Sequence, residues 1–166
     1  MFKKALIPAV MGLTFATAVA AEIPITGNVE SKCIVTTDTN GVYGNPTPSL
    51  LSTAQANGGV EPVVRYDVIQ ADYYKALISV PDTFTESPAL NDVVNWTGDV
   101  TVGEVSDPLM SAYDNDKRLY NNITEIDLTV AGSTWFKISS EADYGYDKAF
   151  PAGQYRSVVT AECIAQ

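Results

Sequence analysis

The chain has 166 residues, of which 46% are hydrophobic, and it carries 10 Lys and Arg against 20 Asp and Glu, with no histidine. This acidic balance repels phosphate backbones and anionic lipid headgroups, so it excludes nucleic acid and membrane surfaces as expected partners. The absence of histidine excludes serine and cysteine triads that use an imidazole base.

Residues 1–21 have the layout of a secretory signal peptide. Lys3 and Lys4 form a short positive segment, an apolar run follows them, and Ala18-Val19-Ala20 offers a cleavage site of small residues. The apolar run is short for a membrane anchor and is not followed by a basic cluster. We therefore expect an exported chain of about 145 residues, the size of one domain, with no membrane span in the mature chain.

The stretch directly after the leader, AEIPITGNVESKCIV, alternates in the way of an extended strand. Side chains at every second position of such a strand share one face. The residues on one face here are Ile23, Ile25, Gly27, Val29 and Cys33.

The rest of the chain consists of short segments rich in Val, Ile, Thr, Tyr and Trp, separated by Gly, Pro, Asn and Asp. No long run has apolar residues at helical spacing. The spacing of the segments is typical of an all-β sandwich. The predicted strands cover residues 25–35, 63–69, 75–80, 93–98, 100–105, 122–130, 134–139 and 155–164.

Two hairpins are predicted among these strands, with turns at Thr97-Gly98-Asp99 and at Ala131-Gly132-Ser133. Residues 39–62 are polar and contain three prolines, which predicts an irregular crossover within one domain. Residues 71–76 are compatible with a single helical turn.

The chain has two cysteines, Cys33 and Cys163. In an oxidising compartment they favour one intrachain disulfide, with two free thiols or a bridge between chains as the alternatives. Two isolated sulfurs without histidine do not form a usual zinc site, so we expect no metal and no cofactor.

Two pairs of carboxylates are the candidates for hydrolytic chemistry: Asp114 with Asp116, and Glu141 with Asp143. Both pairs lie in polar, loop-like stretches, and we interpret them as solvated loop charges. Two basic residues directly follow Asp116, which opposes calcium binding there. We expect that the protein is not an enzyme.

Aromatic residues suggest an alternative function, a self-contained secreted β-sandwich that binds glycan or protein through aromatic loops. Aromatic residues on strands more often pack in a core or across strands. The candidates for a binding platform are Tyr73, Tyr74, Trp96, Tyr144 and Tyr146.

The last predicted strand alternates like the first one. A disulfide requires Cα atoms within about 7 Å, so the two strands are expected to be near neighbours with both alternating sets directed inward. The residues that share a face with one another here are Gly153, Tyr155, Val159, Ala161 and Cys163.

These two ends of the chain resemble subunits of chaperone–usher pili, the bacterial fimbrial pilins. The similarity lies in the leader followed by EIPITGNVE, and in GNVESKCIV, which is similar to the Gly-x-Val…Cys-x-Val of pilin first strands. It also lies in Gly153, the fourteenth residue from the end, and in the acidic, Thr- and Val-rich all-β composition.

The resemblance implies an immunoglobulin-like sandwich, residues 33–166, that lacks its last strand and is completed by a donor strand. Residues 22–32 would be the donor segment, with Ile23, Ile25, Gly27 and Val29 as its inserted residues. Gly153, Tyr155, Val159 and Ala161 would line the acceptor groove.

The resemblance also implies partners and a location. A periplasmic chaperone would fill the groove first, and the next copy of the chain would replace it at an outer-membrane usher. The product would be a cell-surface fimbria that supports adhesion, in which this chain is a structural subunit secreted through the periplasm.

Overall fold

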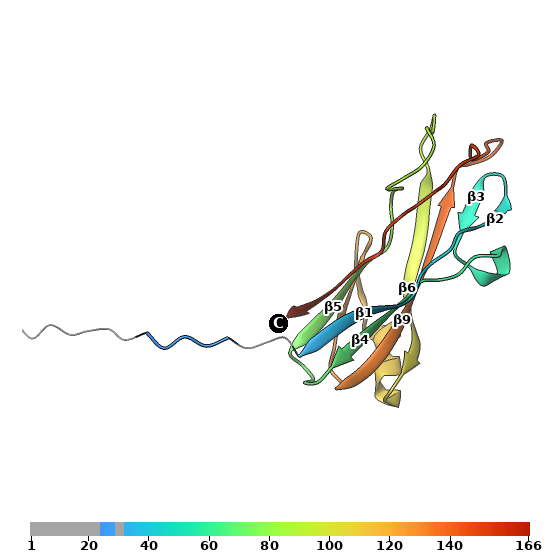
Figure 1. Cartoon of the computed structure of the whole chain (residues 1–166). Helices are drawn as coiled ribbons and strands as arrows, with labels where there is room; N and C mark the ends of the chain where they lie inside the picture. Colours follow the sequence, from blue (N-terminus) through green and yellow to red (C-terminus); the bar gives the residue numbers. More distant parts are fainter. Residues whose placement is uncertain (1–23, 29–31) are drawn as a thin grey trace, which may run out of the picture.

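The computed structural model describes residues 24–28 and 32–166, which form an all-β sandwich of two antiparallel sheets (Figure 1). This confirms the predicted fold class. The signal peptide expected for residues 1–21 lies outside the described residues. No helix in the part of the chain that the structure describes is long and apolar enough to cross a membrane.

The larger sheet has the strand order β1-β4-β9-β3-β2, and β6 pairs with β9 along the opposite edge of that strand. The first half of β9 pairs with β4 and the second half with β3. The bounds of these strands are β1 Cys33–Thr39, β2 Gly44–Thr47, β3 Leu50–Ser52, β4 Val63–Val68, β6 Asn95–Val105 and β9 Gly132–Asp143.

The smaller sheet has the order β10-β5-β8-β7. Its strands are β5 Tyr74–Ser79, β7 Arg118–Tyr120, β8 Ile123–Asp127 and β10 Thr160–Ala165. The short helical elements are η1 Gln55–Asn57, η2 Pro108–Ala112 and α1 Tyr113–Asp116.

The core lies between the two sheets and follows from alternation along the strands. In β4 every second residue is buried, and the same alternation continues through most of β9. Tyr66 is fully buried and crosses the core, with its hydroxyl 3.1 Å from the carbonyl oxygen of Glu162 in β10. Its ring packs edge-on against Phe136, with the centroids 5.6 Å apart.

The predicted hairpin at Thr97-Gly98-Asp99 is wrong, because these residues lie inside the single strand β6. At Gly98 a Cβ would stand 2.5 Å from the Ser139 carbonyl oxygen and 2.4 Å from a methyl group of Val80. The glycine is therefore explained by the close approach of its neighbours rather than by a turn.

The predicted hairpin at Ala131-Gly132-Ser133 is also wrong, because β8 and β9 belong to different sheets. The chain crosses from one sheet to the other between Asp127 and Gly132. Leu128 is buried on the way, and the Val130 N–H donates to the Tyr113 hydroxyl at 3.0 Å. Leu128 and Val130, which alternate with exposed Thr129 and Ala131, both pack toward the core, which explains why the link resembled a continuing strand.

Other predicted boundaries also shift. The polar segment 39–62 contains the paired strands β2 and β3, and residues 71–76 form no helical turn, since β5 begins at Tyr74. Of the first predicted strand, 25–35, residues 33–35 belong to β1 and residues 25–28 are not in a strand, while the last predicted strand, 155–164, is a strand only from Thr160 onward. Both shortened strands flank the candidate site.

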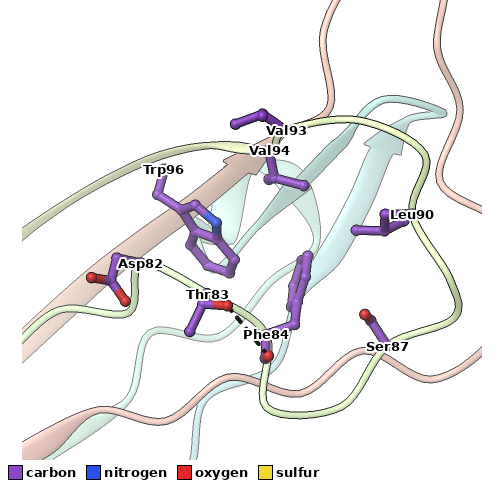
Figure 2. A pocket seen from close by; sticks show the side chains of 8 residues that line it. All are labelled: Asp82, Thr83, Phe84, Ser87, Leu90, Val93, Val94 and Trp96. Carbon is purple, nitrogen blue, oxygen red and sulfur yellow. Dashed lines mark hydrogen bonds between the residues drawn. The ribbon is translucent and has the colours of Figure 1, made fainter.

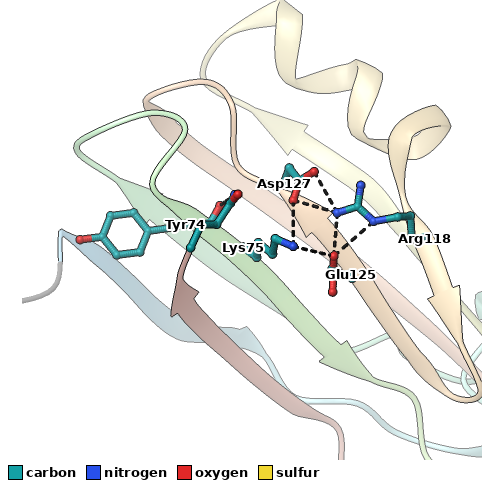
Figure 3. Close-up of polar contacts among 6 residues, drawn as sticks. Tyr74, Lys75, Arg118, Glu125 and Asp127 are labelled. Atoms are coloured by element: carbon teal, nitrogen blue, oxygen red, sulfur yellow. Dashed lines mark hydrogen bonds and ion pairs between the residues drawn. The ribbon is translucent and has the colours of Figure 1, made fainter.

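Charge pairs cover the outer face of the smaller sheet (Figure 3). Arg118 in β7 lies 2.6 Å from Glu125 and 2.8 Å from Asp127, both in β8. Lys75 in β5 lies 3.0 Å from Glu125 on its other side. The hydrogen bond from Arg118, and then that from Lys75, hold the pKa of Glu125 below its usual value. This face is thus electrostatically paired and stands apart from the groove described next.

Candidate strand-binding groove

The two ends of the sandwich chain are joined by a disulfide between Cys33 and Cys163, with Cα atoms 6.3 Å apart. The predicted intrachain pairing is confirmed. The bridge links β1, at the edge of the larger sheet, to β10, at the edge of the smaller one. It therefore ties the two sheets together along one side of the sandwich.

Beyond the disulfide, β1 and β10 present two edges that face each other without pairing. Among the described residues β1 pairs only with β4, and β10 only with β5. The Ile69 N–H donates to the Lys32 carbonyl, so by alternation the backbone groups of Val35 and Thr37 point away from β4. Figure 1 shows the two segments diverging as they run away from the C-terminus.

The space between these edges is a groove of about 930 Å³. The buried side chains of Leu51, Val64 and Ile138 contribute to its lining, so it reaches down to the hydrophobic core. Thr37 and Thr39 of β1 line it on one side. Its composition suits the insertion of an extended segment with alternate apolar side chains.

The structure places all four predicted acceptor residues in the lining of this groove. Val159 and Ala161 are partly buried against the core, and Tyr155 is half-buried. Gly153 is exposed and lies so close to Pro88 that a Cβ would stand 2.4 Å from its Cγ. Partial burial, and then the nearby Tyr144, raise the pKa of the Tyr155 hydroxyl, which donates to the Pro151 carbonyl.

One side chain crosses the groove. The hydroxyl of Tyr43, which follows β1, lies 2.6 Å from Ser157 Oγ on the opposite wall and 2.9 Å from Ser140 Oγ in β9. All three residues line the groove. The sequence analysis did not identify Tyr43, Ser140 or Ser157, because no local pattern connects residues that are 97 and 114 positions apart.

The predicted donor segment lies outside its own groove where it is described. Residues 24–28 are all exposed, and in Figure 1 they lead away from the sandwich. The Ile25 side chain is 98% exposed, and no atom comes within 4 Å of where a Cβ on Gly27 would be. Ile23 and Val29 lie outside the described residues.

The start of β1, from which this arm leaves, is held on both sides. The Lys32 N–H donates to the Tyr74 hydroxyl at 2.8 Å, and the Lys32 carbonyl accepts from the Ile69 N–H at 2.9 Å. Tyr74 belongs to β5 and points its hydroxyl toward β1 (Figure 3). The arm therefore departs from a fixed point beside the disulfide.

The five aromatic candidates do not form one platform. The Tyr74 hydroxyl accepts from the Lys32 N–H at the start of β1, and its neighbour Tyr73 is exposed. Tyr144 is buried and stacks on Phe150 with ring centroids 5.1 Å apart. Tyr146 is 92% exposed and has no ring contact among the described residues. Trp96 alone lines a hollow of the surface, formed with the loop of residues 82–94.

Three of the four predicted carboxylates accept hydrogen bonds from described residues, and Glu141 and Asp143 lie in β9 rather than in the loop that the sequence analysis expected. Glu141 accepts from the Ser52 hydroxyl, Asp143 from the Gly145 N–H, and Asp114 from the Val102 N–H on the free edge of β6. Within residues 24–28 and 32–166 no group of three or more acidic, His or Cys side chains could hold a metal ion. Comparison of the chain with protein-family models, with curated proteins and with solved structures found no match.

Proposed function

We propose that this chain is a structural subunit of an extracellular fimbria that polymerises by donor-strand exchange. The observation that carries the proposal is the open groove between β1 and β10, together with an N-terminal arm that lies outside it. The arm of one subunit, with Ile23, Ile25, Gly27 and Val29, would fill the groove of the next. In this proposal the domain is an immunoglobulin-like sandwich that lacks its last strand, and the arm of the neighbouring subunit supplies that strand.

The two free edges supply the first part of the binding energy. Neighbouring strands in a sheet lie about 4.8 Å apart, so a strand set between two edges forms backbone hydrogen bonds on both sides. Each such bond contributes about 1 kcal/mol net. On β1 the backbone groups that point away from β4 are available for such bonds. The opposite wall of the groove presents side chains such as Val159 and Ala161.

Burial of apolar side chains supplies the second part of the binding energy, and the magnitudes show that backbone hydrogen bonds and apolar burial are both needed. Burying one isoleucine or valine side chain stabilises by about 1.5–3 kcal/mol, so Ile23, Ile25 and Val29 together give several kcal/mol. Ordering the backbone of a seven-residue arm costs about 1–2 kcal/mol per residue, and this cost summed over the arm is similar in size to the gain from the three side chains. Stable insertion therefore depends on the hydrogen bonds of both edges in addition to the apolar side chains.

Assembly partners follow from the same surface. An open groove that exposes core residues such as Val64 and Ile138 in an exported chain favours aggregation unless it is covered, so the proposal includes a periplasmic chaperone and an outer-membrane usher. The contact between subunits is head-to-tail and heterologous, which produces an open filament. Such filaments on the cell surface support adhesion.

The proposal is tested with the mature chain and a variant that lacks residues 21–29. We expect the mature chain to form oligomers that resist mild denaturant, and the truncated chain to stay monomeric. A synthetic peptide of residues 21–31 should bind the truncated chain and raise its melting temperature, whereas the same peptide with Ile25→Asp should not. Size-exclusion chromatography with light scattering and thermal melts provide the readout.

The contrary result is equally clear. If the mature and truncated chains are both monomeric and equally stable, and neither binds the peptide, donor-strand exchange is wrong for this protein.

A further inference from the structure

The surface hollow at Trp96 shares no lining residue with the groove, and a ligand in it would not require the proposed polymerisation. It lies at the end of the larger sheet where β6 begins, and it encloses about 280 Å³ (Figure 2). Trp96 is opposite buried Ala142 in β9, so its side chain lies on the inner face of that sheet. The residues that line the hollow are Asp82, Thr83, Phe84, Ser87, Leu90, Val93, Val94 and Trp96.

Two aromatic rings form one wall of the hollow. Phe84 and Trp96 meet with ring centroids 4.6 Å apart and an angle of 63° between their planes. Phe84 is also in edge contact with Tyr155 at 5.1 Å and with Phe150 at 6.0 Å, and neither of these residues lines the hollow. Because these rings support Phe84 from behind, the aromatic wall is formed before any ligand arrives.

The remaining wall is apolar and accessible. Leu90 and Val94 are half-buried, and Val93 is 75% exposed. Figure 2 shows Leu90 and Val94 across the opening from Phe84 and Trp96. The hollow thus offers apolar surface on more than one side to a ligand about the size of a single ring.

Two polar groups face the same space without a partner among the described residues. Figure 2 shows the indole nitrogen of Trp96 on the edge of the ring turned toward Val94, and the Ser87 hydroxyl turned toward Phe84. No hydrogen bond from either group is present in the described part of the chain. Convergent polar groups in an apolar hollow are typical of a small-molecule site.

The charged and hydroxyl groups at the rim are already engaged. Asp82 accepts from the side-chain amide of Asn122 at 3.2 Å and points away from the hollow. The Thr83 hydroxyl donates to the Phe84 carbonyl at 3.5 Å. No carboxylate is therefore directed at the hollow to select a cation, and the net charge of −10 of the chain disfavours an anion.

We propose that this hollow binds one pyranose unit of a neutral glycan. A pyranose has an apolar face of C–H groups, whose partial positive charge suits the negative faces of Trp96 and Phe84. Its hydroxyl edge accepts from the Trp96 indole N–H and exchanges a hydrogen bond with Ser87. A hollow that is open to solvent and makes two hydrogen bonds binds weakly, with a Kd of about 1 mM or above.

The second tryptophan of the chain provides an internal control. Trp135 lies on β9, its indole N–H donates to Asp38 at 3.3 Å, and the Arg65 guanidinium stacks over its ring at 4.9 Å. The experiment titrates the ¹⁵N-labelled mature chain carrying Ile25→Asp, a change that blocks the proposed polymerisation and lies outside the hollow, with methyl glycosides of glucose, galactose and mannose. We expect at least one glycoside to shift the Trp96 indole resonance saturably, while the Trp135 resonance stays in place.

Two variants locate the site. Ser87→Ala should weaken binding about 3- to 10-fold, since it removes one net hydrogen bond. Thr101→Ala, an exposed change elsewhere on β6, should leave binding unchanged. Trp96→Phe should abolish binding while its thermal melt stays cooperative. Because this variant lacks the Trp96 resonance, its binding is measured by saturation-transfer NMR on the glycoside.

Three outcomes would overturn the proposal. One is no saturable shift with any glycoside up to about 50 mM, a range that covers weak affinities. Another is a parallel shift of both indole resonances, which would show non-specific binding. The third is a shift with choline and with no glycoside, which would identify a cation site instead. None of these results depends on whether the chain polymerises.

Discussion

The hydroxyl of Tyr43 lies 2.6 Å from that of Ser157, so a side chain that follows β1 reaches across the groove to the segment before β10. The same hydroxyl is 2.9 Å from Ser140 in β9, at the inner side of the larger sheet. The two walls of the groove are thus joined twice along its length, covalently by Cys33–Cys163 and by hydrogen bonds at Tyr43.

This contact predicts a coupled loss of stability. Ser157→Ala should lower the free energy of unfolding by about 1 kcal/mol and Tyr43→Phe by about 1–2 kcal/mol, because the first change removes one partly buried hydrogen bond and the second removes two. The double variant should cost less than the sum, since both changes break the same contact. Urea denaturation measures the three values, with Tyr146→Phe as the exposed control. Strict additivity would show that the Tyr43–Ser157 contact contributes nothing.

A second prediction separates the two faces of the last strand. Val159→Glu places a charge among the groove residues and should abolish binding of the 21–31 peptide to the truncated chain, because the inserted strand would bury that charge. Thr160→Glu, the adjacent exposed position outside the groove lining, should bind the peptide as the unsubstituted chain does. Isothermal calorimetry checks both. Equal binding by the two variants would place the peptide elsewhere.

The disulfide leads to a third prediction. It closes a loop with a sequence separation of 130 residues, for which the chain-entropy model gives at most about 5 kcal/mol of stabilisation. Reduction, or replacement of both cysteines by alanine, should lower the denaturation midpoint substantially and loosen β10 from β1. Guanidinium denaturation with and without reductant measures this. An unchanged midpoint would mean that core contacts such as those of Tyr66 hold β10 without the bridge.

Tyr66 leads to a fourth prediction, at alkaline pH. Burial raises the pKa of its phenol above the ordinary value of 10.0, with Glu162 as the second cause. The folded state therefore holds this proton more tightly than the unfolded chain. The resulting stability is fully present below about pH 10 and is lost as the pH rises further.

Tyr66→Phe should remove that part of the alkaline dependence, and at neutral pH it should cost about 1–2 kcal/mol for the buried hydrogen bond to Glu162. Thermal melts between pH 8 and about 11.5 measure the slope, with exposed Tyr120→Phe as the control. If the Tyr66→Phe chain loses stability with pH as steeply as the unsubstituted chain, another group governs the alkaline transition.

Part of the fold could be read directly from alternation. The strand patterns around Val63–Val68 and Thr134–Ser139 predicted β4 and the middle half of β9, because every second side chain there meets the opposite sheet. The two cysteines predicted the disulfide, since one intrachain pairing is available to them. These features depend on local spacing or on simple counting, which a single sequence contains.

The hairpin turns could not be predicted in the same way. Gly98 and Asp99 have turn composition, yet Gly98 is placed inside β6 by the close approach of Val80 and Ser139. The link from β8 to β9 contains Leu128, which is apolar because it is buried in the core, and Val130, which packs against that core. In both cases the reason is a contact with a distant residue, which local composition does not encode.

For the groove, the sequence by itself determined the alternating residues of each end, including Val159 and Ala161, and the covalent link between those ends. Tertiary structure alone decided that β1 and β10 belong to different sheets, with edges that do not pair with each other within the described part of the chain. It also decided that Tyr43 spans the gap and that Trp96 opens onto a hollow. The physical reason is that alternation fixes which side chains point inward, whereas pairing across the sandwich is set by packing of the whole chain.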